Sequence, residues 1–359
     1  MSAYLTINQS ITPPRNTFRN LSLDWISGIL MIKIILMHMK PSFDIAWFHD
    51  LNRFLGYILF MFMPWFFFKA GMYHKSTSFR ECVRSSAKRL LLPWVISGVF
   101  GLVVSYLTIM GHAHDTIKFL CDSMRTVAIA LAMPGNLALW FLIALFACRI
   151  LASTARISNL KYAYATAIIG LLLAFSLHES PPVLCGSPMV FPAIFMAIFF
   201  YTAGYILKSS QRGRLLAMVA AVILAGLCII DHSILDMRTN GISNSSLDYV
   251  LFYPRALCGI IVFNYIASLL PAAYLSKSIF TYVGRNSMSY YVMHMPLILL
   301  CKILSYQIPD LSVENELFMT LGILTVALPI LDRTLRRYWP EALGLRRDKK
   351  RMTAPDELP

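Results

Sequence analysis

The chain has 359 residues, of which 57% are hydrophobic and only 14% are charged, and its mean hydropathy is +0.62. A soluble domain has about a quarter of its residues charged, so this chain has too few charges to cover a water-soluble globule of its size. The apolar fraction excludes a disordered chain, and 7 Cys without a CxxC pair exclude a disulfide scaffold. The net charge of +14 is typical of proteins that bind nucleic acid or face the cytoplasmic leaflet of a membrane.

Apolar segments recur along the whole chain. A helix needs roughly 20 mostly apolar residues to cross a bilayer. An amphipathic stretch within 111–136 is predicted to be an interfacial helix. We therefore expect an all-α fold, a polytopic transmembrane helix bundle. The ten predicted spans, in chain order, are Leu21–Met39, Leu55–Tyr73, Leu90–Met110, Leu137–Ser153, Tyr162–Leu177, Ala193–Leu207, Leu215–Ile230, Tyr249–Leu270, Ser287–Leu304 and Leu317–Ile330.

The distribution of basic residues predicts the orientation of the bundle. If the chain starts inside, 23 of the 32 Lys and Arg fall on inner segments. The positive-inside rule then places both termini in the cytoplasm. We expect a cytoplasmic N-terminal segment over 1–20, a transmembrane domain over 21–332 and a basic cytoplasmic tail over 333–359. The positive charge lies on one membrane face, so membrane lipids are expected partners and nucleic acid is not.

The first predicted span carries three ionisable side chains, Asp24, Lys33 and His38. Each costs at least a few kcal/mol in hydrocarbon and needs a partner, a cavity or a function. Asp24 and His38 fall within about 40° of each other on one helix face but are about 21 Å apart along the axis. His38 must therefore take its orienting partner from another helix. A satisfied interfacial histidine and a helix-start aspartate are the alternative interpretations, and Lys33 is assigned no role.

A basic loop follows the second predicted span. Arg84, Lys88 and Arg89 are spaced so that a helix would show them on nearby faces, and Pro93 stands near the start of the next apolar run. One interpretation is an anion clamp for a phosphorylated soluble donor. The other is ordinary positive-inside topology.

Three further residues are weaker candidates for contacts with a substrate. Arg255 lies inside the eighth predicted span, with Asp248 or His38 as its expected partner, and the alternative is a structural ion pair. Trp140 is expected either to stack on a sugar or to belong to the belt of aromatic side chains at the membrane interface. His294 lies in the middle of the ninth predicted span, where core packing is the alternative.

A cluster of histidines in an outer loop superficially resembles a metal site. It consists of His112, His114 and Asp115. No fourth ligand stands at a suitable spacing, so no metal is expected.

Five short motifs occur in order along most of the chain. They are Asp24, Gly28 and His38; Met63-Pro64-Trp65-Phe66-Phe67-Phe68 with Ala70-Gly71; Lys88-Arg89-Leu90-Leu91-Leu92-Pro93; Leu139-Trp140-Phe141-Leu142; and Gly284-Arg285-Asn286-Ser287 with Tyr290, Tyr291 and His294. In this order and spacing they resemble the acyltransferase 3 family of integral membrane acyltransferases. Four positions depart from its pattern. The family often has a basic residue where Ser27 stands and glycine where Met37 precedes the histidine. A histidine is common where Phe62 stands, and serine is usual where Lys69 stands.

The resemblance implies transfer of an acyl group, commonly acetyl, from cytosolic acyl-CoA to a hydroxyl of an envelope glycan or lipid-linked sugar at the bacterial inner membrane. Arg84, Lys88 and Arg89 would then hold the CoA phosphates. His38 and Asp24 are the expected catalytic residues. Hydroxyl acylation needs a base or a nucleophile near neutral pH, and histidine serves as either, so direct transfer and an acyl-histidine intermediate both stay open.

Two further expectations follow. Because His38 is predicted near the outer end of its span and the basic clamp at the inner face, we expect a transmembrane cavity that joins the two faces. The alternative function is a transporter or flippase that moves an acyl donor or lipid-linked sugar without covalent chemistry. Ten spans and buried charges suit that alternative, whereas the lack of inverted repeats argues against it.

Overall fold

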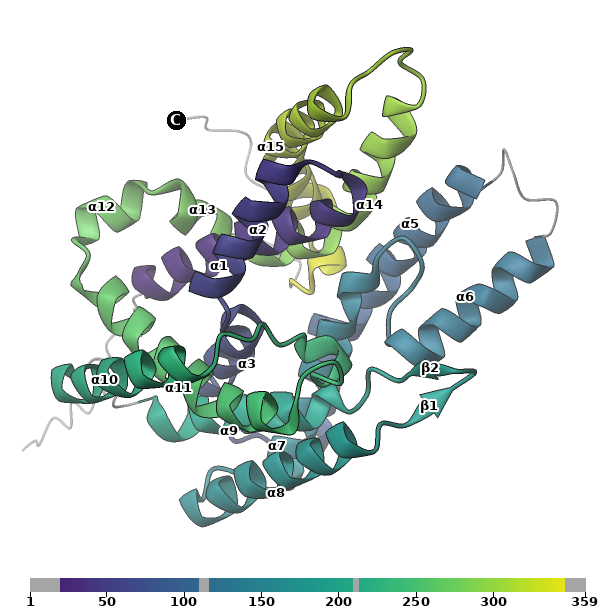
Figure 1. Ribbon diagram of the computed structural model, residues 1–359. Helices are drawn as coiled ribbons and strands as arrows, with labels where there is room; N and C mark the ends of the chain where they lie inside the picture. The colour runs from purple at the N-terminus through teal and green to yellow at the C-terminus, as the bar shows by residue number, and fades with distance from the viewer. Residues whose placement is uncertain (1–19, 110–115, 209–212, 346–359) are drawn as a thin grey trace, which may run out of the picture.

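The computed structural model describes residues 20–109, 116–208 and 213–345, which are almost entirely helical (Figure 1). One short antiparallel hairpin pairs β1 (Val183–Leu184) with β2 (Ser187–Pro188). The prediction of an all-α bundle is confirmed. The helices are α1 (Leu21–Met39), α2 (Ala46–Ile58), α3 (Phe62–Met72), α4 (Phe79–Ser86), α5 (Leu92–Ile109), α6 (Thr116–Ala130), α7 (Trp140–Thr154), α8 (Leu160–Glu179), α9 (Ala193–Leu207), α10 (Arg214–Ile230), α11 (Ser246–Leu269), α12 (Ala272–Lys277), α13 (Ile279–Arg285), α14 (Ser287–Ser305) and α15 (Val313–Tyr338).

Some predictions concern residues outside these ranges. The cluster of His112, His114 and Asp115 lies outside the described residues, as do 1–19 and 346–359. The cytoplasmic position of both termini therefore stays a prediction.

Each of the ten predicted spans coincides with an apolar helix or helix pair. Among the described residues, seven helical segments are long and apolar enough to cross a membrane, and α2 with α3, bent by 41°, makes eight if the pair is counted as one span. Helices α9 and α10 are apolar but shorter. The bend before α3 has a chemical reason, since Pro64 lacks an N–H and its ring would clash with the carbonyl of Phe60 in a continuous helix. By length and composition seven to eight helices qualify as spans, so the count of ten stays a prediction.

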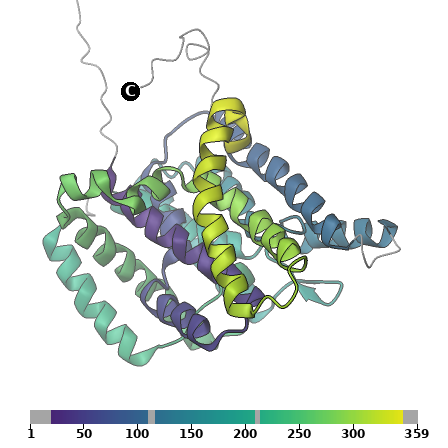
Figure 2. The same cartoon turned by 90° about the horizontal axis from the view of Figure 1, so that it is seen from above.

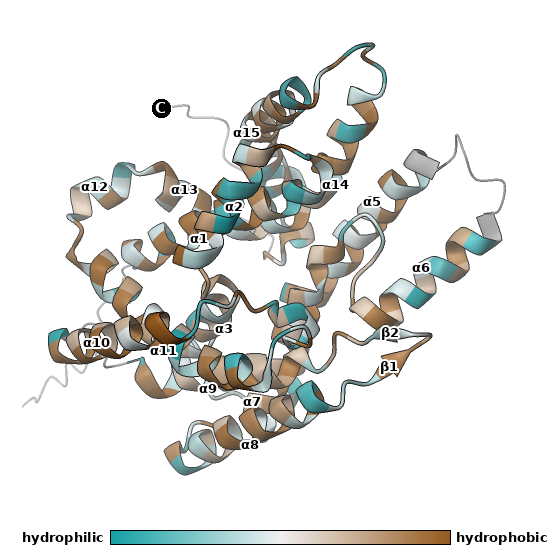
Figure 3. Cartoon of the chain, viewed as in Figure 1, coloured by the Kyte–Doolittle hydropathy of each residue, from teal (hydrophilic) through white to brown (hydrophobic). Residues whose placement is uncertain are grey.

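The outward faces of the bundle are apolar (Figure 3). Val222 on α10 is 75% exposed and Leu172 on α8 is 63% exposed. Water would not tolerate apolar faces of this extent on an isolated soluble chain, whereas a lipid bilayer does. The chain is a multi-pass membrane protein.

Helix α1 lies at the centre of the bundle and packs on α13, α11 and α14 (Figure 2). Its contact with α13 is so close that two glycines are required. A Cβ atom at Gly28 would lie 1.8 Å from the Phe280 carbonyl oxygen, and one at Gly284 would lie 1.7 Å from the Asp24 carbonyl oxygen. The first and last sequence motifs are thus in backbone contact, which brings Arg285 beside Asp24.

The basic motif before α5 forms a π-helical turn, Ala87–Leu91. Pro93 has no N–H to donate to the Arg89 carbonyl, and its ring clashes with that carbonyl in a regular α-helix. The Arg89 carbonyl, which has no partner N–H at Pro93, packs against the short turn Pro340–Leu343 that follows α15. A Cβ atom at Gly344, which ends this turn, would lie 2.4 Å from the Arg89 carbonyl oxygen. The turn therefore fixes Lys88 and Arg89 at the edge of the bundle.

The close contact of α1 with α13 predicts the effect of adding one methyl group. Gly284→Ala forces two backbones apart, and we expect it to lower the free energy of unfolding by about 1–3 kcal/mol or more. Gly226→Ala in α10 is the matched control, because a Cβ there meets nothing within 4 Å. That control should be neutral or slightly stabilising, since alanine is the better helix former. Thermal unfolding in detergent measures both, and equal midpoints for the two variants would contradict the close packing.

Candidate functional site

A cavity of about 760 Å³ lies between α1, α3, α7, α14 and the connection from α10 to α11. Most of its wall is apolar. Its polar lining includes Lys33 and His38 from α1, Trp140 at the start of α7, Arg238 from the connection and Lys302 from α14. Trp140 is 6% exposed and forms part of this wall, so it is in contact with the cavity and not with lipid.

The imidazole of His38 contacts that of His294, with 3.0 Å between His38 Nδ1 and His294 Nε2. His294 is fully buried, and its Nδ1 lies 2.8 Å from the Tyr291 carbonyl oxygen and 3.1 Å from that of Tyr290. Carbonyls only accept hydrogen bonds, so His294 Nδ1 carries the proton and Nε2 accepts. The hydrogen-bond network thereby assigns a proton to His38 Nδ1 and a free lone pair to His38 Nε2.

The structure tests one of the predictions for these two histidines. The expectation that His38 takes its partner from another helix is confirmed, because His294 belongs to α14. His294 was expected to contact a substrate. Its polar contacts are instead with His38 and with two backbone carbonyls, and it is not exposed to the cavity. The substrate contact predicted for His294 stays a prediction, and the structure places its ring against that of His38.

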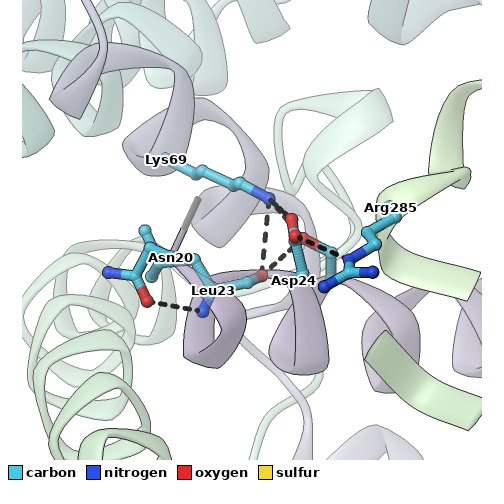
Figure 4. A network of polar contacts seen from close by, with 6 residues as sticks. Asn20, Leu23, Asp24, Lys69 and Arg285 are labelled. Atoms are coloured by element: carbon cyan, nitrogen blue, oxygen red, sulfur yellow. Dashed lines mark hydrogen bonds and ion pairs between the residues drawn. The ribbon is translucent and has the colours of Figure 1, made fainter. Parts of the chain in front are cut away.

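Asp24 lies in a separate cluster of charges in the first turn of α1 (Figure 4). It is 4% exposed, and cations approach it from two sides: Lys69 Nζ lies 3.7 Å from Oδ1, and Arg285 Nε lies 3.8 Å from Oδ2. Asn20 begins the helix, its side chain accepting a hydrogen bond from the Leu23 N–H at 3.3 Å. The contacts of Asp24 join α1 to α3 and α13, and they are not contacts with His38.

Two of the four departures from the family pattern, Ser27 and Lys69, contact each other in this cluster. Lys69 Nζ donates to Ser27 Oγ at 2.5 Å. One of the two cations beside Asp24 therefore comes from α3, and the small Ser27 on α1 leaves room for it.

Arg255 is buried in a structural ion pair. Its Nη1 lies 2.8 Å from Asp231 Oδ2 and donates to the Asp231 carbonyl oxygen at 2.7 Å. The prediction that Arg255 pairs with Asp248 or His38 is wrong. The chain turns back after α10 and brings Asp231 against the middle of α11. The pair holds the connection whose residues Ile234–Arg238 line the cavity, so Arg255 supports the wall.

The three basic residues of the predicted clamp are all exposed. Arg84 lies on α4, and Lys88 and Arg89 lie on the π-helical turn that follows. Arg84 borders an open hollow of about 790 Å³ together with Arg80. The clamp thus has access to solvent and is separate from the cavity of His38.

A second hollow, of about 870 Å³, adjoins the first through Ser78 and Phe79. It lies between the connections α3–α4 and α7–α8, and His74 and Arg156 line it. Burial, followed by the positive charges of Arg149 and Lys208, lowers the pKa of His74 below its usual 6.5. The His74 imidazole is therefore neutral at pH 7, with Nδ1 3.0 Å from the Tyr201 hydroxyl.

Lys33 is a site residue that sequence reasoning missed. Helix periodicity places it about 140° from His38, which suggested a different environment. Its long side chain runs along α1, however, and Nζ lies 3.4 Å from Met37 Sδ. It therefore lines the same cavity as His38. The available signal was the length of the lysine side chain, which spans one helical turn.

Because Lys69 on α3 contacts Ser27 on α1, we predict that a basic residue at either position can supply the cation that pairs with Asp24. Lys69→Ser leaves the buried Asp24 with fewer partners and should lower the free energy of unfolding by about 1–3 kcal/mol. Adding Ser27→Arg to that variant returns a cation to Asp24 from α1, into the space that the lysine leaves, and should recover much of the loss. Thermal unfolding of the wild type, both single variants and the double variant forms a complete cycle. Purely additive losses in the double variant would contradict this account.

The whole arrangement lies within one conserved sequence family. A sequence model of the acyltransferase domain matches residues 20–331, from the cap of α1 to within α15. A search of curated proteins and a search of solved structures found no match. The matched range contains the His38–His294 pair, the Asp24 cluster and the π-helical turn, and it covers nearly the whole chain. The chain therefore belongs to the acyltransferase 3 family of membrane acyltransferases.

Proposed function

We propose that the protein transfers an acyl group, acetyl in the simplest case, from cytosolic acyl-CoA to a hydroxyl of an envelope glycan or lipid-linked sugar in the bacterial inner membrane. The observation that carries the proposal is His38, which lines the cavity of about 760 Å³ and is hydrogen-bonded to the buried His294 behind it. Such a cavity has the volume of a small-molecule site, and the imidazole in it has a free lone pair. The family supplies the reaction class.

In this proposal His38 acts as the general base. Its Nε2 takes the proton of the acceptor hydroxyl while the hydroxyl oxygen attacks the thioester carbon. The imidazolium that forms keeps its hydrogen bond from Nδ1 to His294 Nε2, 3.0 Å away, which orients the ring. The proton then passes to the sulfur of CoA as the C–S bond breaks. An acyl-histidine route would use the same lone pair, and mass spectrometry of the acid-quenched protein distinguishes the two routes.

A small apolar cavity offers a path for the donor. It has a volume of about 80 Å³ and shares Ile34, Met63 and Tyr291 with the larger cavity. From there it extends to Ser287 and Met288 in the first turn of α14. By the predicted topology that turn is at the inner face, so we propose that the pantetheine arm of acyl-CoA enters along this path.

The nucleotide end of the donor would then remain outside the bundle. We place it at the exposed Arg84, Lys88 and Arg89, next to the two hollows that meet at Ser78 and Phe79. Phosphate groups pair well with such exposed cations. The acceptor would approach from the opposite face, where the predicted topology places the outer end of α1.

The function is tested with inside-out membrane vesicles that contain the protein and radiolabelled acetyl-CoA. We expect label to appear covalently on a glycan or lipid-linked sugar, and His38→Ala to abolish this transfer while the variant stays folded in the membrane. Label that crosses the vesicle membrane without becoming covalently bound would support the transporter instead. Unchanged transfer by His38→Ala would refute the assignment of His38.

The hydrogen bond from His38 to His294 predicts a graded series of variants. His294→Leu removes the acceptor that fixes the tautomer of His38, and kcat should fall by about 10²–10⁴-fold with a small change in KM. His294→Gln can present an amide oxygen near the position of Nε2 and should recover part of the rate. Steady-state kinetics at several acetyl-CoA concentrations separates the two parameters. Wild-type rates for the leucine variant would contradict the orienting role.

The basic clamp predicts an effect on donor affinity. Reversing charge at Arg84, Lys88 and Arg89 together should raise KM for acetyl-CoA by about tenfold or more, since charge-assisted hydrogen bonds to phosphate are replaced by repulsion. Lys277→Glu is the control, because Lys277 is also exposed and is also predicted to face the cytoplasm. An unchanged KM in the triple variant would rule out the clamp.

A further inference from the structure

The ammonium group of Lys33 is buried in the cavity with only weak partners. The residue is 5% exposed, and its Nζ lies 3.1 Å from the centroid of the Phe62 ring and 3.4 Å from Met37 Sδ. Among the described residues, no carboxylate forms an ion pair with it. Asp236, the carboxylate in the described lining of this cavity, pairs with Arg238 at 3.8 Å.

Two other cations of the bundle, the buried Arg255 and the half-buried Lys302, show what is missing at Lys33. Arg255 is paired with Asp231 at 2.8 Å, and Lys302, which lines the same cavity, is paired with Glu316 at 3.0 Å. A thioether is a weak acceptor, and an ammonium has three N–H donors. Lys33 therefore keeps donors available for an oxygen atom that enters the cavity.

Lys33 Nζ contacts Sδ of Met37, the residue that directly precedes His38 in α1. The side chains of Lys33 and His38 line one cavity. A base and a cation thus border the same enclosed space.

We propose that Lys33 stabilises the oxyanion of the acyl-transfer reaction, an inference that rests on the proposed function. When the acceptor oxygen forms its bond to the thioester carbon, the C=O electron pair moves to the carbonyl oxygen, and His38 Nε2 holds the hydroxyl proton. Lys33 Nζ donates a hydrogen bond to that negative oxygen. The electron pair returns as the C–S bond breaks, and the thiolate leaving group takes the proton from His38.

The physical reason for using a cation here is the low dielectric constant of the cavity. A charge that is preorganised where negative charge develops stabilises a transition state far more in such a site than in water. The neutral thioester carbonyl gains less from the same contact, so the interaction favours the transition state over the bound donor. The kinetic signature is an effect on kcat and not on KM.

The test uses the full-length protein in inside-out membrane vesicles that contain the endogenous acceptor, with release of free CoA thiol as the readout and acetyl-CoA as the varied substrate. Lys33→Met keeps the length and apolar packing of the side chain without its charge. We expect its kcat to fall by about 10²–10³-fold with KM for acetyl-CoA within about twofold of the wild type. Lys33→Arg, which keeps the cation, should recover part of the rate.

Two comparisons distinguish this role from a structural one. A lysine that serves packing alone would be replaced by methionine without loss, and thermal unfolding confirms that the variant is folded. Lys40→Met, at an exposed lysine just beyond α1, is the matched control and should behave as the wild type.

The outcomes that overturn the inference are separate from those that overturn the proposed function. An unchanged kcat for Lys33→Met, or a raised KM with an unchanged kcat, refutes the oxyanion role while the wild type still transfers acetyl groups. No thiol release and no labelled product from the wild type refutes the proposed function and this inference with it.

Discussion

The pairing of buried charge along α1 is the constraint on which the rest of the site depends. Near the N-terminal end of α1, Asp24 is enclosed by Lys69 and Arg285, and the glycine contact of α1 with α13 makes that approach possible. Near the C-terminal end, His38 is hydrogen-bonded to His294. Because unpaired ionisable groups are costly in an apolar interior, these contacts hold α1 against α3, α13 and α14 and thereby position the cavity wall.

The same constraint separates structural charges from chemical ones. Arg255 and Lys302 have carboxylate partners at 2.8 Å and 3.0 Å. The first pair joins α11 to the α10–α11 connection, and the second joins α14 to α15. Lys33 forms no ion pair with a carboxylate among the described residues, and its side chain lines the same cavity as His38. A cavity that holds both a base and a cation is suited to acyl transfer, in which a proton is removed and a negative oxygen forms.

Sequence reasoning succeeded where the argument depended on a single helix. The apolar spans coincide with helices, and the rise along α1 excluded a relay between Asp24 and His38. It failed for Arg255, whose partner was sought nearby in sequence or at the site. Asp231 lies 24 residues away and reaches Arg255 only because the connection between α10 and α11 folds back. The position of Lys33 was misjudged because periodicity describes where a Cβ points and not where a long side chain ends.

The sequence by itself determined the class of protein, the apolar spans and the motifs of the acyltransferase 3 family, since these depend on composition, local periodicity and order along the chain. Only the tertiary structure decided that His294 contacts His38, that Lys69 contacts both Asp24 and Ser27, and that Lys33 lines the cavity. Such contacts join residues on different helices, or depend on the path of one flexible side chain. They are set by how the helices cross, and one sequence contains no direct record of those crossings.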